Sequence, residues 1–391
     1  MDRELRADFE RRWGDDKYPA LVAAVNDPYR WKAEFRICET PIFLTPDWTQ
    51  ILQEAGVSIL SQIRTPEFER HAAGAIPAGE EVPGTKDHPE FVQIDFAIAE
   101  EDGRLVPKLI ELQGFASMFC YQVALDHGIR SVGLVPEGVS QYWSGLEEES
   151  FLGSLRSLVV RDMPLENVIL LEIEPEKQRT KIDFSCTEAM LGIRTFCLTD
   201  LRRSGRTLYV ERDGRRTEVR RIYNRVIFDE LGKKDLKLDF HPTDEVDVDW
   251  VAHPNWFHKL SKHTLPFLKG DSVPECHFVS DLSSIPSDLE NYVLKPLYSF
   301  AGAGVIVDVT REAVESVSHP SAYLLQRKVK YAEFLETPSG RSKAEIRLMY
   351  FWDKEPVLAG TLVRVSRGSL SSVSKNTGDT WIGATTGYHR V

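Results

Sequence analysis

The sequence lacks long apolar runs, an apolar leader and an excess of positive charge. Its 391 residues contain no run of about 18 consecutive apolar residues, so we expect no transmembrane helix. The opening residues, Met1 to Arg6, are charged and do not resemble a signal peptide. With 48 Lys and Arg against 60 Asp and Glu, the formal net charge is −12. This balance disfavours a broad basic surface for nucleic acid or for an anionic membrane.

Cysteine is scarce, and several catalytic signatures are missing. The cysteines are odd in number, form no CxxC motif and are scattered: Cys38, Cys120, Cys186, Cys197 and Cys276. A disulfide framework or a structural zinc site is therefore not expected, and the thiols suit a reducing, cytoplasmic location. The sequence contains neither GxSxG nor HExxH, which leaves serine-hydrolase and zinc-hydrolase functions with little support.

The length predicts two or three packed units, since one domain usually has roughly 150 residues. Residues 1–90 have a mostly helical pattern, with one helix opening at Thr45-Pro46-Asp47. Residues 167–230 predict a strand, a helix, a second strand and a hairpin that turns at Asp213-Gly214, together a small α/β unit. We therefore expect an α+β or α/β chain with boundaries near 150 and 250, giving segments 1–150, 151–250 and 251–391.

The segment from Phe91 to Gln113 predicts a β-hairpin with a polar face. Apolar residues alternate with polar ones on both sides of an Asp102-Gly103 turn. If the turn centres on Gly103, Asp95 lies opposite Glu111, and Gln113 shares the face of Glu111. Two facing carboxylates repel each other, and a Mg²⁺ ion between them would remove that repulsion. The alternative is an exposed acidic face on an edge hairpin.

A glycine-rich loop follows a short apolar strand that ends in a lysine. The strand, Tyr292 to Leu297, contains Lys295, and the loop contains Ser299, Gly302 and Gly304. Glycines allow backbone N–H groups to approach a phosphate closely. The loop lacks the GxxxxGK[ST] pattern of a P-loop, and an ordinary tight turn is the alternative. A helix predicted over residues 255–265 carries a second candidate cation, Lys262.

The order of these motifs resembles the ATP-grasp superfamily. Lys295 with the glycine loop resembles its phosphate-covering loop, and the strand at 324–329 resembles its adenine-holding hinge. The later motifs resemble its C-terminal sheet: Glu345-Ile346-Arg347, Val363-Arg364-Val365 and Asn376-Thr377-Gly378. The Mg²⁺-binding pair expected after them is missing there, and its counterpart is the hairpin with Asp95 and Glu111. The chain thus resembles the circularly permuted, glutathionylspermidine-synthetase-like members, with a small α/β domain inserted in the middle.

The resemblance implies a role for each candidate residue. Lys262 and Lys295 would bind the ATP phosphates, under Ser299, Gly302 and Gly304. Gln326 and the backbone from Arg327 to Val329 would hold adenine, and Glu333 would bind the ribose. Arg347, Arg364 and Asn376 would stabilise the transferred phosphate and the oxyanion. Mg²⁺ would be held by Asp95, Glu111 and Gln113, where Gln replaces the usual Asn.

The resemblance implies an ATP- and Mg²⁺-dependent ligase that joins a carboxylate to an amine through an acyl phosphate. The substrates would be small molecules or peptides, with no nucleic acid and no membrane as partner. A homodimer is possible, because members of this superfamily often dimerise. Two alternatives stay open: a phosphotransferase that delivers phosphate to a hydroxyl group, and a nucleotide-binding protein without catalysis.

Overall fold

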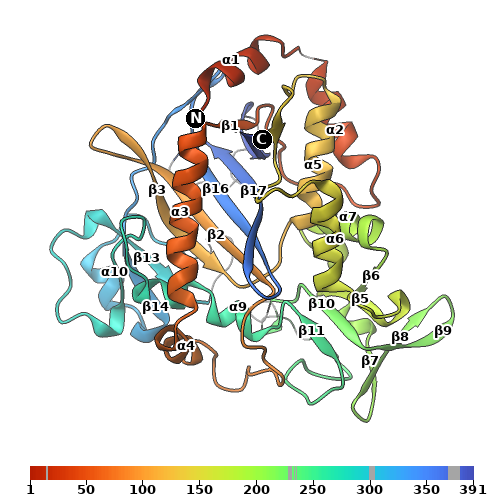
Figure 1. Cartoon of the computed structure of the whole chain (residues 1–391). Helices are drawn as coiled ribbons and strands as arrows, with labels where there is room; N and C mark the ends of the chain where they lie inside the picture. The colour runs from red at the N-terminus through yellow and green to blue at the C-terminus, as the bar shows by residue number, and fades with distance from the viewer. Residues whose placement is uncertain (15, 228–230, 233, 235, 299–303, 369–378) are drawn as a thin grey trace.

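A twisted antiparallel sheet forms the centre of the molecule in the computed structural model (Figure 1). The structure describes all residues except 15, 228–230, 233, 235, 299–303 and 369–378. The strands follow the order β18-β17-β16-β2-β3, and β15 pairs with β16. Their bounds are β2 Phe91–Glu101, β3 Arg104–Gln113, β15 Leu335–Thr337, β16 Gly340–Trp352, β17 Pro356–Ser366 and β18 Gly383–Thr385. One sheet therefore unites residues 91–113 with residues 340–366 and 383–385.

The predicted hairpin is confirmed, and a β-bulge sets its register. Asp102 and Gly103 both have positive φ, at 49° and 74°, as a two-residue type I′ turn requires. At the turn Glu101 pairs with Arg104, but farther along Asp95 pairs with Glu111. The register shifts because Ile110 is an extra residue in β3. The expected pairing of the two carboxylates is therefore present, although the turn alone would have placed Ile110 opposite Asp95.

The long helix α3 (Pro46–Ile63) covers one face of the central sheet (Figure 1). Thr45 caps it by accepting a hydrogen bond from the Trp48 amide, and Pro46 occupies the first turn, where its missing N–H costs nothing. The predicted start is confirmed. Two apolar side chains of this helix face the solvent instead, since Ile51 and Val57 are 36% and 61% exposed.

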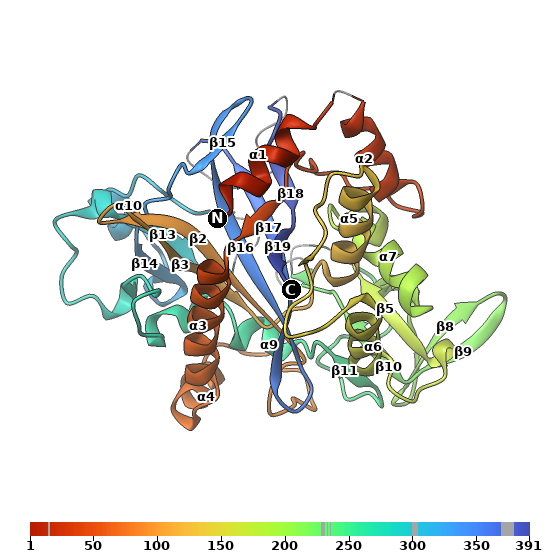
Figure 2. The ribbon, with the colours of Figure 1, turned by 45° about the horizontal axis from the view of Figure 1, so that its top comes forward.

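The middle of the chain forms a parallel sheet with helices beside it (Figure 2). Its strand order is β11-β10-β5-β6, and every pair is parallel. The strands are β5 Val168–Glu172, β6 Arg194–Cys197, β10 Arg221–Asn224 and β11 Asp249–Val251. The helices beside it are α5 Phe119–Ser131, α6 Glu148–Val159 and α7 Lys181–Leu191. The predicted strand, helix and strand within residues 167–198 are confirmed.

A small three-stranded antiparallel sheet projects beside the parallel one (Figure 1). Its strands are β7 Arg202–Ser204, β8 Thr207–Arg212 and β9 Arg215–Val219. Asp213 and Gly214, both with positive φ, make the turn between β8 and β9. The predicted hairpin is therefore confirmed at its predicted turn.

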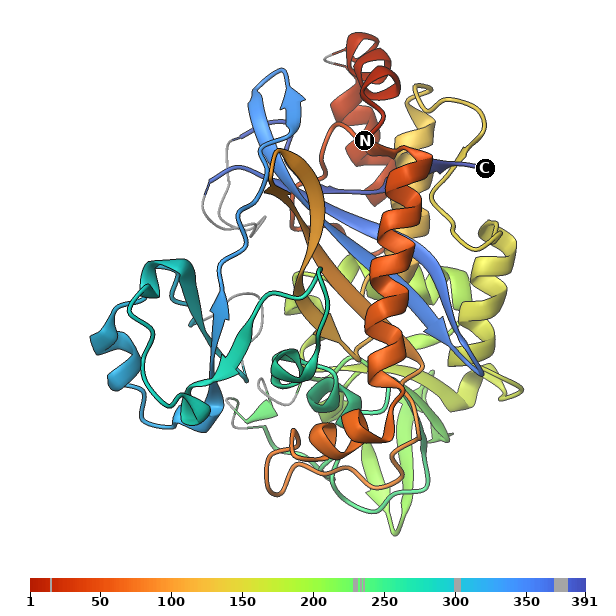
Figure 3. The same ribbon diagram turned by 60° about the vertical axis from the view of Figure 1, so that its left-hand side comes forward.

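A separate lobe carries the strand with Lys295 (Figure 3). It consists of the antiparallel sheet β12-β14-β13 and a short helix, with bounds β12 Cys276–Phe278, β13 Tyr292–Pro296, β14 Tyr323–Arg327 and α10 Arg311–Glu315. The helix predicted over residues 255–265 is wrong in length. Helix α9 ends after Asn255–Lys259, and a 3-10 segment, Lys262–Phe267, follows it. Pro266 lies inside that segment and cannot donate a helical hydrogen bond.

The two ends of the chain meet at a small third layer. The sheet β1-β19-β4 joins Ile42–Leu44, Gly387–Arg390 and Val139–Ser140, and the side chains of Asp2 and Arg390 pair at 3.3 Å.

The remaining helices are α1 Arg3–Arg11, α2 Lys17–Asn26 and α4 Pro66–Ala73. No helix in the described part of the chain is both long and apolar enough to cross a bilayer.

Helices from both sides of the boundary expected near residue 150 pack against one another. One hydrophobic cluster combines Leu125 of α5, Leu155 of α6 and Phe184 of α7 with Tyr388 near the C-terminal end. The helices on both sides of that boundary thus share a core. The division into segments 1–150, 151–250 and 251–391 remains a prediction.

Candidate functional site

A cluster of paired charges lies on the face of the central sheet opposite α3. Asp95 on β2 accepts hydrogen bonds from Arg347 Nε at 2.5 Å and Arg347 Nη2 at 2.7 Å. Its Oδ2 also accepts from Arg364 Nη2 at 2.6 Å. Glu345 holds Arg364 from the other side, at 2.8 Å and 3.0 Å. Cross-strand register produces the cluster, because Arg347 lies opposite Asp95 and Arg364 opposite Glu345.

The two arginines determine the charge of Asp95, which is 1% exposed. Burial alone would raise the pKa of this carboxyl group, but the positive charges of Arg347 and Arg364 outweigh burial and hold the pKa well below its usual value. Burial would likewise lower the pKa of Arg364, yet Asp95 and Glu345 raise it. Asp95 and Arg364 are therefore both charged at neutral pH.

Arginine side chains contact the carboxylate that was predicted to bind Mg²⁺. Both oxygens of Asp95 accept hydrogen bonds from guanidinium groups, so a Mg²⁺ ion there would share them with Arg347 and Arg364. The alternative of an exposed acidic face is wrong for Asp95, since the side chain is buried. The role of Asp95 as a Mg²⁺ ligand stays a prediction.

Two further residues extend the cluster. Gln93 accepts a hydrogen bond from Arg347 Nη1 at 2.9 Å and donates one to the Ser117 carbonyl at 2.6 Å. Glu345 accepts a hydrogen bond from the hydroxyl group of Tyr331. Sequence reasoning did not select Gln93 or Glu345 as site residues. Gln93 lies two positions from Asp95, and Glu345 lies two positions from Arg347, so each shares a strand face with a predicted residue.

The bulge in β3 provides a contact for Lys295. The Nζ atom of Lys295 donates to the carbonyl of Ile110, the extra residue, at 3.4 Å. Burial lowers the pKa of this amine, whereas the negative charge of Glu111 opposes the shift and the positive charge of Lys262 adds to it. Three predicted residues, Lys262, Lys295 and Glu111, are thus brought within electrostatic reach of one another.

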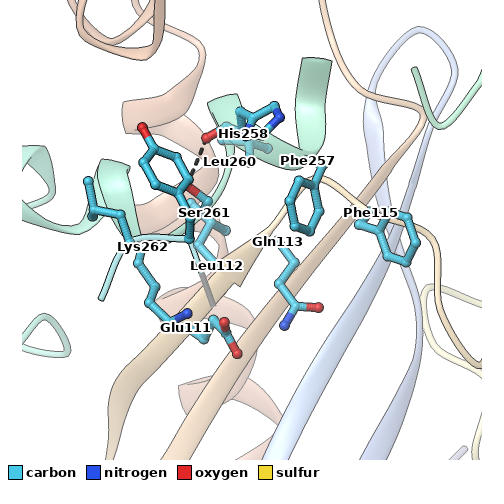
Figure 4. A pocket seen from close by; sticks show the side chains of 11 residues that line it. Glu111, Leu112, Gln113, Phe115, Phe257, His258, Leu260, Ser261 and Lys262 are labelled. Atoms are coloured by element: carbon cyan, nitrogen blue, oxygen red, sulfur yellow. Dashed lines mark hydrogen bonds between the residues drawn. The ribbon is translucent and has the colours of Figure 1, made fainter. Parts of the chain in front are cut away.

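A narrow cavity opens between Glu111 and Lys262 (Figure 4). Glu111 and Gln113 come from the end of β3, and Lys262 reaches toward Glu111 from the segment after α9. The full lining is Glu111, Leu112, Gln113, Phe115, Phe257, His258, Leu260, Ser261, Lys262, Leu297 and Tyr298. The cavity measures about 30 Å³, so a nucleotide phosphate would have to push side chains apart to enter.

Gly114 explains how α9 reaches β3. A Cβ atom on Gly114 would lie 2.5 Å from the carbonyl oxygen of Trp256, which is closer than any side chain tolerates. The Gly114 amide donates to the carbonyl of Leu260 at 3.0 Å. This close approach places His258 in the cavity wall, where burial lowers its pKa to about 4. His258 is therefore neutral at pH 7, and sequence reasoning did not select it.

The predicted adenine hinge lies on β14 and just after it. Gln326 is buried, whereas Arg327 is exposed and pairs with Asp288 at 2.9 Å. The amides of Arg327 and Lys328 already donate to the carbonyls of Glu275 and Asn291. In the described part of the chain, Val329 is therefore the hinge residue whose amide has no backbone acceptor.

The remaining predicted residues are spread out or not described. Glu333 is exposed and pairs with Lys343 at 3.9 Å. Gly304 has a φ of 72°, and a Cβ there would lie 3.1 Å from the ring of Pro296, so this position needs glycine. Ser299, Gly302 and Asn376 lie outside the described residues.

A buried arginine follows the carboxyl end of strand β10. Arg225 Nη1 donates to Asp183 at 2.6 Å, and Nη2 lies 3.4 Å from the Ser117 hydroxyl group. Its Nε atom is buried and has no partner among the described residues. Ligands of open parallel sheets bind at this edge, and the position of Arg225 directly after a strand was the signal in the sequence.

Glu111 and Gln113 could hold a Mg²⁺ ion together with oxygens from a ligand and from water. The described ranges contain no group of three His, Cys, Asp or Glu side chains that could hold a metal. Mg²⁺, however, often takes only one or two protein oxygens and completes its shell with phosphate and water. Glu111 and Gln113 line one cavity and offer such oxygens.

Comparison with known proteins supports the fold. No family model and no curated protein matches the chain. The chain is a mixed α/β protein with a glutathione-synthetase-like fold. It superposes on the apo structure of a glutathione synthetase-like effector from Globodera pallida with a TM-score of 0.59 and 10% identity, covering 96% of each chain. The fold expected from the ATP-grasp resemblance is confirmed at this level, and the circular permutation stays a prediction.

Proposed function

We propose that this protein is an ATP- and Mg²⁺-dependent ligase that joins a carboxylate to an amine through an acyl phosphate. One observation carries the proposal. Lys262 and Glu111, predicted from distant parts of the sequence, line one cavity, and Lys295 lies within electrostatic reach of both. The glutathione-synthetase-like fold supports it.

The lysines and the glycine loop bind the ATP phosphates in this proposal. Lys295 is held by the bulge carbonyl, and Lys262 extends along the cavity wall. Ser299, Gly302 and Gly304 cover the phosphates. Because burial lowers the pKa of the Lys295 amine, a phosphate anion would restore the charge that burial opposes.

Glu111 and Gln113 would hold Mg²⁺ together with the phosphate oxygens. The ion supplies charge neutralisation for phosphoryl transfer. Asp95, which pairs with Glu111 across the hairpin, would be a further Mg²⁺ ligand. It also holds Arg347 and Arg364 in place, so that their remaining donors face the reacting groups. Planar guanidinium groups suit an acyl phosphate and an oxyanion.

The remaining predicted residues would bind the adenosine part of ATP and the substrates. Gln326 and the amide of Val329 hold adenine, Glu333 binds the ribose, and Asn376 supports the transferred phosphate. The free donor of Arg225 suits the carboxylate of a small-molecule or peptide substrate. We also propose the permuted order of motifs, which the pairing of β2 with β16 supports, and a homodimer as the assembly.

The test begins with binding and ends with turnover. Isothermal titration with a non-hydrolysable ATP analogue should show Mg²⁺-dependent binding that weakens at least tenfold in Lys295→Met and loses its Mg²⁺ dependence in Glu111→Gln. The exposed Lys32→Gln variant is the matched control and should bind like the wild type. Unchanged affinity and Mg²⁺ dependence in the first two variants would contradict the site.

Turnover distinguishes the ligase from its alternatives. ADP release should require both a carboxylate and an amine, and mass spectrometry should find a new amide. ADP release with a hydroxyl compound and no amine would indicate a phosphotransferase. Binding without turnover over a broad panel of amino acids, polyamines and peptides would indicate a nucleotide-binding protein.

A further inference from the structure

One peptide group joins the central sheet to the helices beside the parallel sheet. Its carbonyl, on Ser117, accepts a hydrogen bond from Gln93 of β2 at 2.6 Å. Its N–H, on Met118, donates to Asp183 of α7 at 2.9 Å. The side chains of Gln93 and Asp183 are both buried. One peptide plane is therefore held from two sides, by residues that belong to different layers of the molecule.

The backbone at this peptide group has an unusual conformation. Met118 has a φ of 68°, in the left-handed region that residues other than glycine rarely adopt. Backbone strain of this kind persists only where neighbouring contacts enforce it, and it is common beside functional sites. Helix α5 begins directly after Met118, and its Tyr121 amide donates to the second carboxylate oxygen of Asp183 at 3.0 Å. The contacts of the peptide group therefore also fix the start of α5.

The side chains that hold the peptide group also contact two arginines. Gln93 Oε1 accepts from Arg347 Nη1 at 2.9 Å, and Asp183 accepts from Arg225 Nη1 at 2.6 Å. Arg225 also directs its Nη2 to the Ser117 hydroxyl group, 3.4 Å away. A continuous series of buried hydrogen bonds thus leads from an arginine of the central sheet to the arginine that follows β10.

The two partners of Gln93 require a donor and an acceptor on one side chain. The guanidinium group of Arg347 can only donate, and the Ser117 carbonyl can only accept. The Gln amide offers one group to each. An ionised Glu could accept from Arg347 but could not donate to the carbonyl, and an apolar side chain could do neither. The chemistry of the two partners therefore explains why an amide stands at this position.

We propose that Gln93 is a positioning residue that holds Arg347 and Arg225 in one fixed arrangement. It acts through the peptide group between Ser117 and Met118. The consequence for turnover rests on the proposed function, in which Arg347 stabilises the transferred phosphate and Arg225 receives the substrate carboxylate. Loss of Gln93 then misaligns phosphate and carboxylate and leaves nucleotide binding unchanged.

Hydrogen–deuterium exchange of the full-length protein tests the arrangement without a ligand. In Gln93→Met the amides of Met118 and Tyr121 should exchange at least about fivefold faster, because loss of a buried hydrogen bond beside them eases local opening by about that factor. Asn26→Leu is the matched control. The Asn26 amide is also buried, but it donates to Val22 at 2.9 Å and accepts from Ala33 at 2.7 Å, within one stretch of chain. It should leave both exchange rates unchanged.

Turnover of the same variants shows whether the arrangement matters for the reaction. Gln93→Met should lower kcat for ADP release about 10- to 100-fold, since a misplacement of about 1 Å can cost that much. The KM for ATP should change less than about twofold. Asn26→Leu should change neither constant. Melting temperatures of the two variants show whether a general loss of stability, which would affect both, explains the difference.

A second variant keeps the test decisive if Gln93→Met does not fold. Gln93→Glu has the shape of Gln and still accepts from Arg347, but its carboxylate cannot donate to Ser117, so it should show the same faster exchange and lower kcat. Unchanged exchange at Met118 and Tyr121 would overturn the proposal, and so would an unchanged kcat beside a wild type that turns over. If the wild type releases no ADP, the proposed function fails, and the exchange rates still decide the role of Gln93.

Discussion

The arginines and the lysines of the site are held in different ways. Arg347 and Arg364 lie in short, charge-assisted hydrogen bonds to Asp95 and Glu345, between 2.5 and 3.0 Å long. Lys295 instead donates to one neutral carbonyl at 3.4 Å, and burial lowers its pKa. The arginine cluster thus has its counter-charges without a ligand, while the lysine stands to gain from an anion. We expect the loss of a counter-charge in the cluster to affect the stability of the fold, and the loss of the lysine to affect binding.

The largest expected effect follows from breaking the arginine cluster. Asp95→Asn leaves Arg347 and Arg364 buried without their shared counter-charge, and such a loss costs about 3–5 kcal/mol of unfolding free energy. Urea denaturation measures it. Asp27→Asn, which breaks an exposed pair with Lys32, is the control and should cost less than about 1 kcal/mol. Equal costs for the two variants would contradict the role given to Asp95.

Lowering the pH should reduce the unfolding free energy first through His258 and then, at lower pH, through Asp95. The pKa of His258 falls to about 4 in the folded state, so the unfolded chain binds more protons between roughly pH 6.5 and 4, and stability falls as pH falls through that window. The pKa of Asp95 is also lowered, so its contribution is lost only at lower pH. In unfolding free energies measured from about pH 7 to about pH 2, the decline between pH 6.5 and 4 should be less steep in His258→Gln, by up to about 1.4 kcal/mol per pH unit.

The same pH series in Asp95→Asn provides the contrast. This variant should keep the decline between pH 6.5 and 4, because His258 is intact, and should lose the steeper decline that begins below about pH 4. If both variants flatten the same part of the profile, the two regions do not titrate independently.

A smaller effect is expected from the lysine. Lys295→Met removes a charge that burial disfavours, so stability should stay the same or rise slightly, while affinity for the ATP analogue should fall by about 10- to 100-fold. Thermal melting and calorimetry measure both quantities. A loss of stability as large as that of Asp95→Asn would remove the distinction between the two regions.

The smallest effect is expected at the hinge. Arg327 directs its side chain outward to Asp288 and Tyr292, and only its backbone adjoins the proposed adenine site. Arg327→Ala should change nucleotide affinity less than about twofold and stability by less than about 1 kcal/mol. A tenfold loss of affinity would show that the side chain itself contacts the nucleotide.

The sequence revealed elements whose cause is local. Alternating apolar residues and the Asp102-Gly103 dipeptide predicted the hairpin, and Thr45-Pro46 predicted the start of α3. The helix over 255–265 was predicted too long, because helical periodicity continues past Lys259 although α9 stops there. Local signals therefore located the elements better than they located the ends of those elements.

The contacts of the site were harder to predict, because they join residues that are distant in the chain. Asp95 meets Arg347 across 252 positions, and nothing near Asp95 in the sequence announces a guanidinium partner. Without that partner, a carboxylate facing Glu111 suggests only a metal ligand, so the arginine contacts of Asp95 were not predicted. The bulge at Ile110 could not be predicted either, since an extra residue in one strand is recognised only when the pairing of both strands is known.

That surplus residue changes the pairing of β3 with β2 at a single point. Glu111 to Gln113 pair with Gln93 to Asp95 on the site side of the bulge, and on the other side the hairpin ends at the exposed turn of Asp102 and Gly103. The turn is therefore a suitable point for inserting a peptide tag or a fluorescent label close to the site without rearranging it.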